Sequence, residues 1–342
     1  MTIRKMFGCG LVIVSLFGVL GELAAQNFRQ STINWHSTPV QTEAIGTNQK
    51  PPVLTGVSLQ QEGMLVAMVG DDHVVNLFDR GTGKFDRQLI EHTDWVRTAK
   101  FSPDGTKIAT GGNDRRLIVW DIAGTGRPSV IGEHPAAIVD VAWSPDGTKL
   151  ATVGFENKLR IYSTETSQEI NALSTSCEDL RTVAFSPDSG SVAVGGRNGK
   201  VEIWNVGTGQ QTTAIQIHKR RIRCITFSNN NELLTCGDDS VVRVTDLTDT
   251  TNIRSLPRHG GKLFSLCTMQ GGLLATGGSD NTIYIWDLSD LKQIGTLAGH
   301  NGTVTSLDFK DNVLASASYD TRVRLWTTEK MARLNDTRTL GR

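Results

Sequence analysis

The stretch HTDWVRTAKFSPDGTKIATGGNDRRLIVWD, residues 92–121, alternates short runs of strand-like composition with turns. The runs at 95–101, 107–110 and 116–120 alternate in polarity or are rich in β-branched and aromatic residues, as β-strands are. Between the first two runs, Ser-Pro-Asp-Gly joins a proline that fixes φ to a glycine that tolerates positive φ, which indicates a tight turn. The stretch is therefore predicted to form successive short strands. After the N-terminus the chain shows no sustained helical period.

The Trp-Asp pair that ends this stretch recurs along the chain at a nearly constant step. Its copies, some of them altered, are Phe78-Asp79, Trp120-Asp121, Tyr162-Ser163, Trp204-Asn205, Thr245-Asp246, Trp286-Asp287 and Trp326-Thr327. The steps between them are 42, 42, 42, 41, 41 and 40 residues. A repeat of this length indicates an array of one supersecondary unit.

Three further positions keep the same phase. A histidine follows five of the aromatic positions by fourteen residues, at His92, His134, His218, His259 and His300, whereas the first and fourth repeats have Lys50 and Ser176. A turn residue precedes each aromatic position by six residues, at Asp72, Asp114, Glu156, Asn198, Asp239, Asp280 and Asp320. Four residues earlier stand Met68, Thr110, Thr152, Val194, Thr235, Thr276 and Ser316.

These features resemble the WD40-repeat family, whose units run from a Gly-His pair to a Trp-Asp pair, over roughly residues 50–330. The resemblance implies an all-β fold, a seven-bladed β-propeller whose blades are four-stranded antiparallel sheets. Residues 50–342 would form this propeller, which leaves no room for a second structured domain. The Ser-Pro-Asp-Gly turns are similar to those of bacterial members of the family.

The resemblance also implies a hydrogen-bonded tetrad of side chains inside each intact blade. The three complete sets are His92, Thr110, Asp114 and Trp120; His259, Thr276, Asp280 and Trp286; and His300, Ser316, Asp320 and Trp326. A histidine, a hydroxyl and an aspartate also make up a hydrolase triad. We interpret the sets as structural, because they repeat and no nucleophile elbow accompanies them. No catalytic residue, no cofactor and no metal site is therefore expected, since histidines spread around a ring do not converge on one ion.

The first 25 residues differ in kind from the rest. The basic pair Arg4-Lys5 precedes an apolar run at 6–20, and the segment ends in the small residues Ala24-Ala25. This pattern predicts a signal peptide, residues 1–25, cleaved after Ala25, and hence export to the periplasm or the extracellular space. The alternative is an uncleaved N-terminal membrane anchor, although the run is short for a membrane span.

Residues 26–49 form a polar stretch that is either a linker or part of the ring closure. In the family, a strand from the opposite terminus often completes one blade. By the period, Thr42–Gln49 occupies the place of an outer strand, and Met331–Thr337 is the other candidate. The sequence does not decide between them.

Four cysteines follow the predicted leader: Cys177, Cys224, Cys236 and Cys267. Cys224 and Cys236 lie on two strands that flank one turn, so they could face each other and form a disulfide in an oxidising compartment. We favour the interpretation that they are small buried apolar residues. Cys177 lies in a predicted loop and is the best candidate for an exposed thiol.

Variable residues beside the periodic positions are expected to project toward one face and the mouth of the central channel. The aromatic and basic residues of this set, types enriched in binding hot spots, are Trp95, Arg97, Phe155, Arg181, Arg197, Arg221, Arg223, Lys262, Phe264 and Tyr319. Blades 4 to 6 carry mostly Arg and Lys on this face, and blades 1 to 3 mostly Asp and Glu. Such polarity favours docking of an acidic or extended peptide segment. The alternative is a solvated rim without a partner.

The predicted function is therefore a non-enzymatic protein–protein interaction scaffold. The alternative is a small ligand or an anion at the central channel, where Arg97, Arg181 and Arg223 could hold a phosphate or a carboxylate. Catalysis there is disfavoured, because the residues at the corresponding position of all seven repeats include no acid and no histidine. They are Thr55, Arg97, Val139, Arg181, Arg223, Phe264 and Thr305. Nucleic acid is not an expected partner, since 35 basic and 35 acidic residues give zero net charge. Membrane contact is expected only through an uncleaved anchor.

Overall fold

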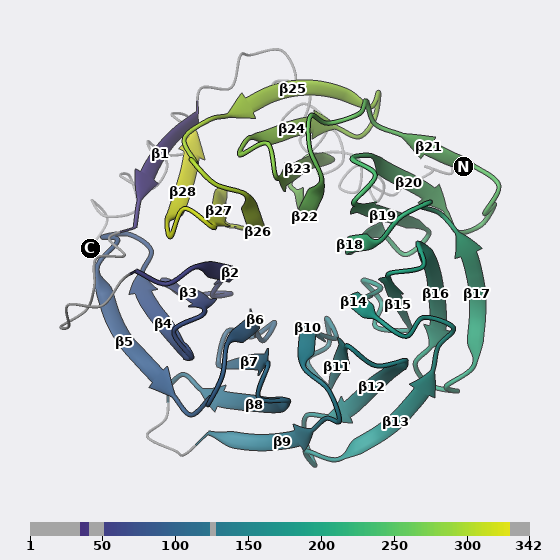
Figure 1. The fold of residues 1–342 in the computed structure, drawn as a ribbon, viewed down its shortest axis with the longest axis horizontal. Coiled ribbons are helices and arrows are strands. Elements are labelled where there is room, and N and C mark those ends of the chain that lie inside the picture. The colour runs from purple at the N-terminus through teal and green to yellow at the C-terminus, as the bar shows by residue number, and fades with distance from the viewer. Residues whose placement is uncertain (1–34, 41–50, 124–127, 329–342) are drawn as a thin grey trace, which may run out of the picture. The chain divides into compact units, whose positions relative to one another are not determined.

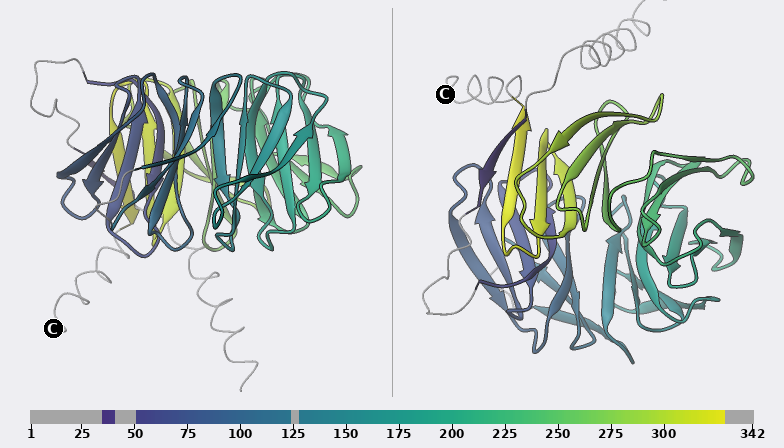
Figure 2. Two further views of the ribbon diagram at one scale, coloured as in Figure 1. Left: turned by 90° about the horizontal axis from the view of Figure 1, so that it is seen from below. Right: turned by 45° about the horizontal axis from the view of Figure 1, so that its top comes forward.

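Seven four-stranded antiparallel sheets surround a central axis, which confirms the predicted fold class (Figure 1). The computed structural model describes residues 35–40, 51–123 and 128–328. These residues contain 28 strands and no helix, so this part of the chain has no helix long and apolar enough to cross a membrane. In the side view, the strands run between the two faces of the ring (Figure 2).

Each blade has four strands, ordered from the channel outward. Blade 1 has β2 (Leu54–Leu59), β3 (Leu65–Gly70), β4 (Val74–Asp79) and β5 (Phe85–Ile90); blade 2 has β6 (Val96–Phe101), β7 (Lys107–Gly112), β8 (Arg116–Asp121) and β9 (Ser129–Glu133); blade 3 has β10 (Ile138–Trp143), β11 (Lys149–Gly154), β12 (Lys158–Ser163) and β13 (Glu169–Ser174). Blade 4 has β14 (Leu180–Phe185), β15 (Ser191–Gly196), β16 (Lys200–Asn205) and β17 (Gln211–Gln216); blade 5 has β18 (Ile222–Asn229), β19 (Glu232–Gly237), β20 (Val242–Asp246) and β21 (Ile253–Ser255). Blade 6 has β22 (Leu263–Met269), β23 (Leu273–Gly278), β24 (Ile283–Asp287) and β25 (Lys292–Leu297); blade 7 has β26 (Val304–Lys310), β27 (Val313–Ser318), β28 (Val323–Thr328) and β1 (Trp35–Pro39).

An N-terminal strand closes the ring. The outer strand of blade 7 is β1, which pairs antiparallel with β28 so that Ser37 faces Trp326. Val40, just after β1, is 3% exposed and packs in the core shared by blades 7 and 1. The two segments weighed from the sequence, Thr42–Gln49 and Met331–Thr337, lie outside the described residues.

The hydrophobic core lies between neighbouring blades. Val69 and Leu77 of blade 1, for example, pack with Ile108 and Trp120 of blade 2, and all four are at most 5% exposed. Burying each such side chain contributes about 1.5–3 kcal/mol. Every blade therefore depends on both of its neighbours, which is why the ring must close.

Serine turns join the first and second strands of several blades. In blade 2, Ser102 Oγ accepts from the Lys107 backbone N at 2.9 Å, and Asp104 Oδ1 accepts from Ser102 Oγ at 2.5 Å. Gly105 has φ +69°, and a Cβ there would lie 1.9 Å from the Gln61 carbonyl oxygen, so this position requires glycine. The turn predicted from Ser-Pro-Asp-Gly is confirmed.

The four cysteines after the predicted leader are free thiols. Cys224 and Cys236 are cross-strand partners, as their spacing suggested, and burial raises the pKa of the Cys224 thiol to about 11. The expectation that Cys177 is an exposed thiol is wrong. Its side chain packs in the core of blades 3 and 4 at 4% exposure, because the loop that carries it folds inward.

Candidate interaction face and channel mouth

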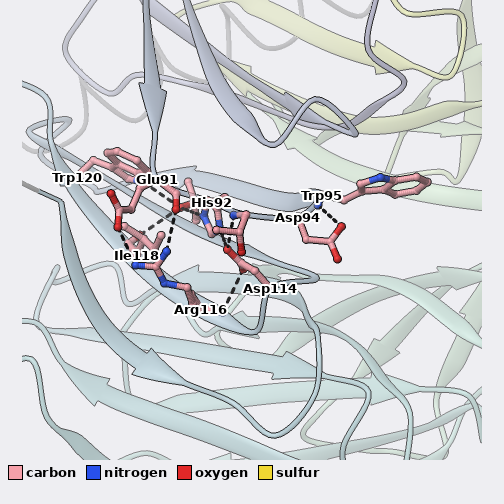
Figure 3. A network of polar contacts seen from close by, with 10 residues as sticks. Glu91, His92, Asp94, Trp95, Asp114, Arg116, Ile118 and Trp120 are labelled. Atoms are coloured by element: carbon pink, nitrogen blue, oxygen red, sulfur yellow. Dashed lines mark hydrogen bonds and ion pairs between the residues drawn. The ribbon is translucent and has the colours of Figure 1, made fainter.

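The four polar residues expected in blade 2 form one chain of hydrogen bonds (Figure 3). His92 Nδ1 lies 2.7 Å from Asp114 Oδ2, and His92 Nε2 lies 2.8 Å from Thr110 Oγ1. Trp120 Nε1 donates to the same hydroxyl at 2.9 Å. With His92 protonated on Nδ1, each donor in the chain meets an acceptor. Burial by itself raises the pKa of the Asp114 carboxyl, but the hydrogen bond from His92 holds it below its ordinary value.

Blade 7 repeats this arrangement. His300 lies 2.9 Å from Asp320 through Nδ1 and 2.7 Å from Ser316 Oγ through Nε2, and Trp326 Nε1 donates to that hydroxyl at 2.8 Å. The serine hydroxyl of blade 7 therefore takes the same place in the hydrogen-bond chain as the threonine hydroxyl of blade 2.

Blade 6 departs from the expected tetrad. His259 Nε2 lies 2.8 Å from Thr276 Oγ1, and Trp286 Nε1 donates to that hydroxyl at 3.0 Å. Within the described chain, however, His259 Nδ1 has no hydrogen-bond partner, and Asp280 Oδ2 accepts from Tyr284 Oη at 3.1 Å instead. The predicted hydrogen bond between Asp280 and His259 is therefore wrong. The Asp280 carboxylate accepts instead from the phenol of Tyr284, two residues before Trp286.

The residue at the same position, two residues before the aromatic, also changes the contacts of the turn acid in blades 3 and 5. In blade 3, Arg160 pairs with Glu156 at 3.1 Å, and Glu156 also accepts from His134 Nδ1 at 3.1 Å. In blade 5, Arg243 donates to Asp239 at 2.7 Å. Periodic spacing did not mark this position, because its residues vary in type from blade to blade.

Blade 4 has lost the tetrad altogether. Ser176 stands at the histidine position, and its backbone N and its hydroxyl both bond Glu202 Oε1. Val194 replaces the central hydroxyl. As a result the buried Trp204 Nε1 has no hydrogen-bond partner among the residues that the structure describes.

The tetrads are inaccessible to a substrate. The Thr110, Thr276 and Ser316 side chains are all 0% exposed, so none of these hydroxyls can reach a bound molecule. Across residues 35–40, 51–123 and 128–328, no group of three His, Cys, Asp or Glu residues is placed to hold a metal ion. The geometry supports a structural role for these residues.

The ten residues expected at the interaction face lie on what we call the upper face, formed by the loops that precede the inner strands and the loops between the second and third strands of each blade. Trp95, Phe155 and Tyr319 are 42%, 39% and 46% exposed there, unusually high values for aromatic residues. Trp95 points away from the tetrad of its own blade (Figure 3). Arg197 and Lys262 are exposed, whereas Arg97, Arg181, Arg221, Arg223 and Phe264 are partly buried nearer the axis.

Two cation–π stacks line the mouth of the channel. The guanidinium carbons of Arg97 and Arg181 lie 5.2 and 4.4 Å from the centroid of the Phe155 ring. Arg223 lies 4.7 Å from the Phe264 ring, which meets Tyr319 edge-on at 6.5 Å. Each stack bridges blades, so side chains from several blades are held in one fixed surface.

Ion pairs neutralise part of the basic surface expected at blades 4 to 6. Asp179 pairs with Arg181 at 2.7 Å and with Arg221 at 3.5 Å. Asp238 pairs with Arg223 at 2.8 Å. Sequence spacing did not predict these pairs, which make Arg181, Arg221 and Arg223 less available to an acidic partner than their charges suggest.

Five other cations of this face form no ion pair with any residue that the structure describes. Arg197, Lys219, Arg220, Arg258 and Lys262 are exposed, and their side chains make no ion pair within the described part of the chain. We call them the rim cations. All five lie on the upper face of blades 4 to 6, outside the ring of paired arginines.

The channel contains a charged cluster that the sequence did not reveal. The channel has a volume of about 670 Å³. Its lining includes Lys100, Asp140 and Asp308 from blades 2, 3 and 7, which form the cluster. Asp140 accepts from the Val183 backbone N at 3.1 Å, and Asp308 from that of Leu59 at 2.7 Å, so each carboxylate ties its blade to the next. Burial by itself lowers the pKa of the Lys100 ammonium, but the Asp308 and Asp140 carboxylates raise it above its ordinary value. Lys100 and Asp308 are eight residues past His92 and His300, a shared offset that could have marked them.

The fold and the repeats define the class of protein: a seven-bladed β-propeller built of WD40 repeats. Residues 250–287 and 291–327 match the family described as WD domain, G-beta repeat, and residues 96–261 match the WDR19 first beta-propeller. WD40 propellers are typically protein-interaction scaffolds.

Similar stretches occur in eukaryotic proteins. The small ribosomal subunit protein RACK1 of Caenorhabditis elegans is 34% identical over 58 residues, covering 17% of this chain and 18% of that protein. The nuclear distribution protein PAC1 of Arthroderma benhamiae is 38% identical over 61 residues, or 18% and 13% of the two chains. The actin-interacting protein 1-2 of Arabidopsis thaliana is 32% identical over 56 residues, or 16% and 9%. The chain thus spans less than a fifth of the length of these relatives.

Proposed function

We propose that this protein is a non-enzymatic scaffold whose upper face, at blades 4 to 6, docks an acidic or extended segment of a partner protein. The observation that carries the proposal is the set of rim cations, which are exposed on one face and form no ion pair within the described residues. Exposed charges of one sign attract an oppositely charged segment over a distance and fix its orientation on contact. The inaccessible tetrad hydroxyls support a binding function over a catalytic one.

Exposed aromatic residues beside the rim supply the apolar part of the contact. Tyr319, next to the Phe264 stack, and Phe155, between two guanidinium groups, lie at the inner edge of the same face. Rim charges act mainly on the rate and specificity of docking, whereas rigid aromatic anchors hold most of the affinity. A segment that crosses from the rim to the channel mouth would use both.

Reversing two rim charges should weaken the binding of an acidic peptide. We expect Lys219→Glu with Arg220→Glu to raise the Kd of a fluorescent glutamate-rich peptide at least about tenfold at low salt, with less effect as salt screens the charges. Lys84→Glu with Lys107→Glu is the matched control, because both lysines are exposed and lie at the opposite face, Lys84 just before β5 and Lys107 as the first residue of β7. Fluorescence anisotropy measures both pairs. Equal affinity of wild type and both double variants would contradict the proposal.

We also propose that the protein resembles exported bacterial members of the family and is exported through a signal peptide at residues 1–25. The basic pair, the apolar run and the small residues before Gln26 support this. N-terminal sequencing of the protein from the exported fraction should then begin at Gln26. Recovery of the intact N-terminus in the membrane fraction would instead favour an anchor, and recovery only from the cytoplasm would refute export.

A second candidate function is anion binding at the channel mouth. The observation that favours it is the convergence of Arg97, Arg181 and Arg223, one from each of three blades, on the lining of the channel.

A further inference from the structure

Three guanidinium groups occupy equivalent places in the ring. Arg97, Arg181 and Arg223 are each the second residue of an inner strand, namely β6, β14 and β18. The other members of this tier are Thr55, Val139, Phe264 and Thr305. The two threonine hydroxyls are already bonded to backbone carbonyls of the neighbouring blade, at 2.7 and 3.0 Å. The tier therefore presents three cations to the channel and no anion.

The positive charge at this mouth exceeds the negative charge. Four guanidinium groups, those of Arg97, Arg181, Arg221 and Arg223, meet the two carboxylates of Asp179 and Asp238. Among these six groups two positive charges are left over, and the Asp94 carboxylate, whose charge raises the pKa of Arg97, offsets them only in part. Two of the four groups, from Arg97 and Arg181, are also held against the same Phe155 ring.

Arg97 is the guanidinium whose charge no ion pair offsets within the described residues. Its Nε donates to Asn113 Oδ1 at 2.5 Å, and an amide is neutral. Burial, and next the charge of Arg181, lower the pKa of Arg97, which means that the folded protein holds this cation at a cost. A bound anion would relieve that cost.

The guanidinium nitrogens that carry no hydrogen bond indicate which class of ligand fits the site. Arg181 and Arg223 contact their carboxylates through Nε and Nη2, and Nη1 of each carries no hydrogen bond within the described residues. Both Nη atoms of Arg97 also carry no hydrogen bond within the described residues. Guanidinium edges on separate strands suit a group with several oxygens in different directions. A planar carboxylate matches one edge, whereas a tetrahedral oxyanion can meet several.

We propose that the channel mouth binds a doubly charged tetrahedral oxyanion of the phosphate class, with Arg97 as its principal ligand and Arg181 and Arg223 as the flanking ones. The proposal deepens the second candidate function and is independent of the rim. The same chemistry is offered by a free phosphate ester and by a phosphorylated residue of a partner segment. Near pH 7.5 either group carries close to two negative charges.

Calorimetric titration of the purified protein tests the site. Inorganic phosphate near pH 7.5 should bind saturably, and sodium acetate at equal ionic strength should bind at least about tenfold more weakly. Arg97→Gln should reduce phosphate affinity at least about tenfold, because it keeps a donor but removes the uncompensated charge. Arg97→Lys, which keeps the charge and loses the planar fork, should fall in between. Lys107→Gln, which neutralises an exposed lysine on the opposite face, is the control and should bind phosphate as wild type does.

Two peptides identify the source of the oxyanion. A short peptide with one phosphoserine is compared with its unphosphorylated form, in wild type and in Arg97→Gln. If the phosphopeptide binds in an Arg97-dependent manner and more tightly than inorganic phosphate, the group belongs to a partner segment. Equal binding of the two assigns it to a small molecule. The proposal is overturned if wild type binds neither more tightly than acetate, or if folded Arg97→Gln binds them as wild type does.

The rim proposal and the channel-mouth proposal can be refuted independently of each other. Arg97→Gln should leave the affinity for the glutamate-rich peptide within about threefold, since the rim cations are intact, and the Lys219→Glu, Arg220→Glu pair should leave phosphate binding within the same range. Loss of peptide binding with phosphate binding retained would refute the rim, and the converse would refute the channel mouth.

Discussion

Thr110→Val is expected to lower the free energy of unfolding by about 2–6 kcal/mol. The Thr110 hydroxyl is the shared partner of His92 Nε2 and Trp120 Nε1, and both rings are at most 6% exposed. Valine has the same shape but cannot bond either nitrogen, so two buried polar groups lose their partner at about 1–3 kcal/mol each. Denaturant titration measures the loss. Thr110→Ser keeps the hydroxyl, as Ser316 does in blade 7, and should cost much less.

Blade 4 offers the reverse change as a matched control. Val194 stands where blade 2 has Thr110, and the buried Trp204 Nε1 above it lacks a partner among the described residues. Val194→Thr should therefore raise the free energy of unfolding by about 1 kcal/mol. If Thr110→Val and Val194→Thr both leave stability unchanged, the tetrad does not stabilise its blade.

Lys100→Met is expected to destabilise the protein by about 3 kcal/mol or more, because it leaves Asp140 and Asp308 inside the channel without their cation. These carboxylates also accept the backbone bonds that tie blades 3 to 4 and 7 to 1. Lys107→Met removes an exposed lysine from the same blade and should change stability by no more than about 0.5 kcal/mol.

The deficit of Lys100→Met should grow with pH. Burial raises the pKa of Asp140, and the Lys100 charge opposes that rise. Without the lysine, the pKa in the folded state lies still further above its value in the unfolded chain. A carboxyl of this kind favours folding at low pH, and that contribution is lost as pH rises through the folded pKa. Denaturant titrations near pH 5 and pH 8 should therefore show the larger deficit at pH 8. Equal deficits would contradict the electrostatic explanation.

The fold could be predicted because its signals repeat. The aromatic mark, the histidine and the turn acid are each set by a local requirement of one blade, so seven copies reinforce one another. Blade 6 shows the limit of this inference. Asp280 has the correct spacing, but Tyr284 competes for its carboxylate, and a competing partner on the next strand has no periodic signal.

The interaction face could be predicted only as a set of residue types. Trp95, Phe155 and Tyr319 are exposed there, but Phe264 is partly buried. The charge available at blades 4 to 6 depends on Asp179 and Asp238, whose pairing is a matter of distance across strands and loops. The Lys100 cluster has one sequence signal, the shared offset of Lys100 and Asp308 from the histidines of their blades, but its members come from three blades and meet only in the closed ring. Local spacing specifies a blade, and contacts between blades specify what this ring can bind.

The central claim is that a partner segment docks on the upper face of blades 4 to 6. Hydrogen exchange measured by mass spectrometry, with and without a saturating glutamate-rich peptide, tests it most directly. We predict slower exchange in the upper-face loops at 197–199, 218–221 and 258–262, and unchanged exchange in the serine turns of the opposite face at 102–106 and 144–148. Slower exchange at those serine turns, or no change in the upper-face loops at saturation, would contradict the claim.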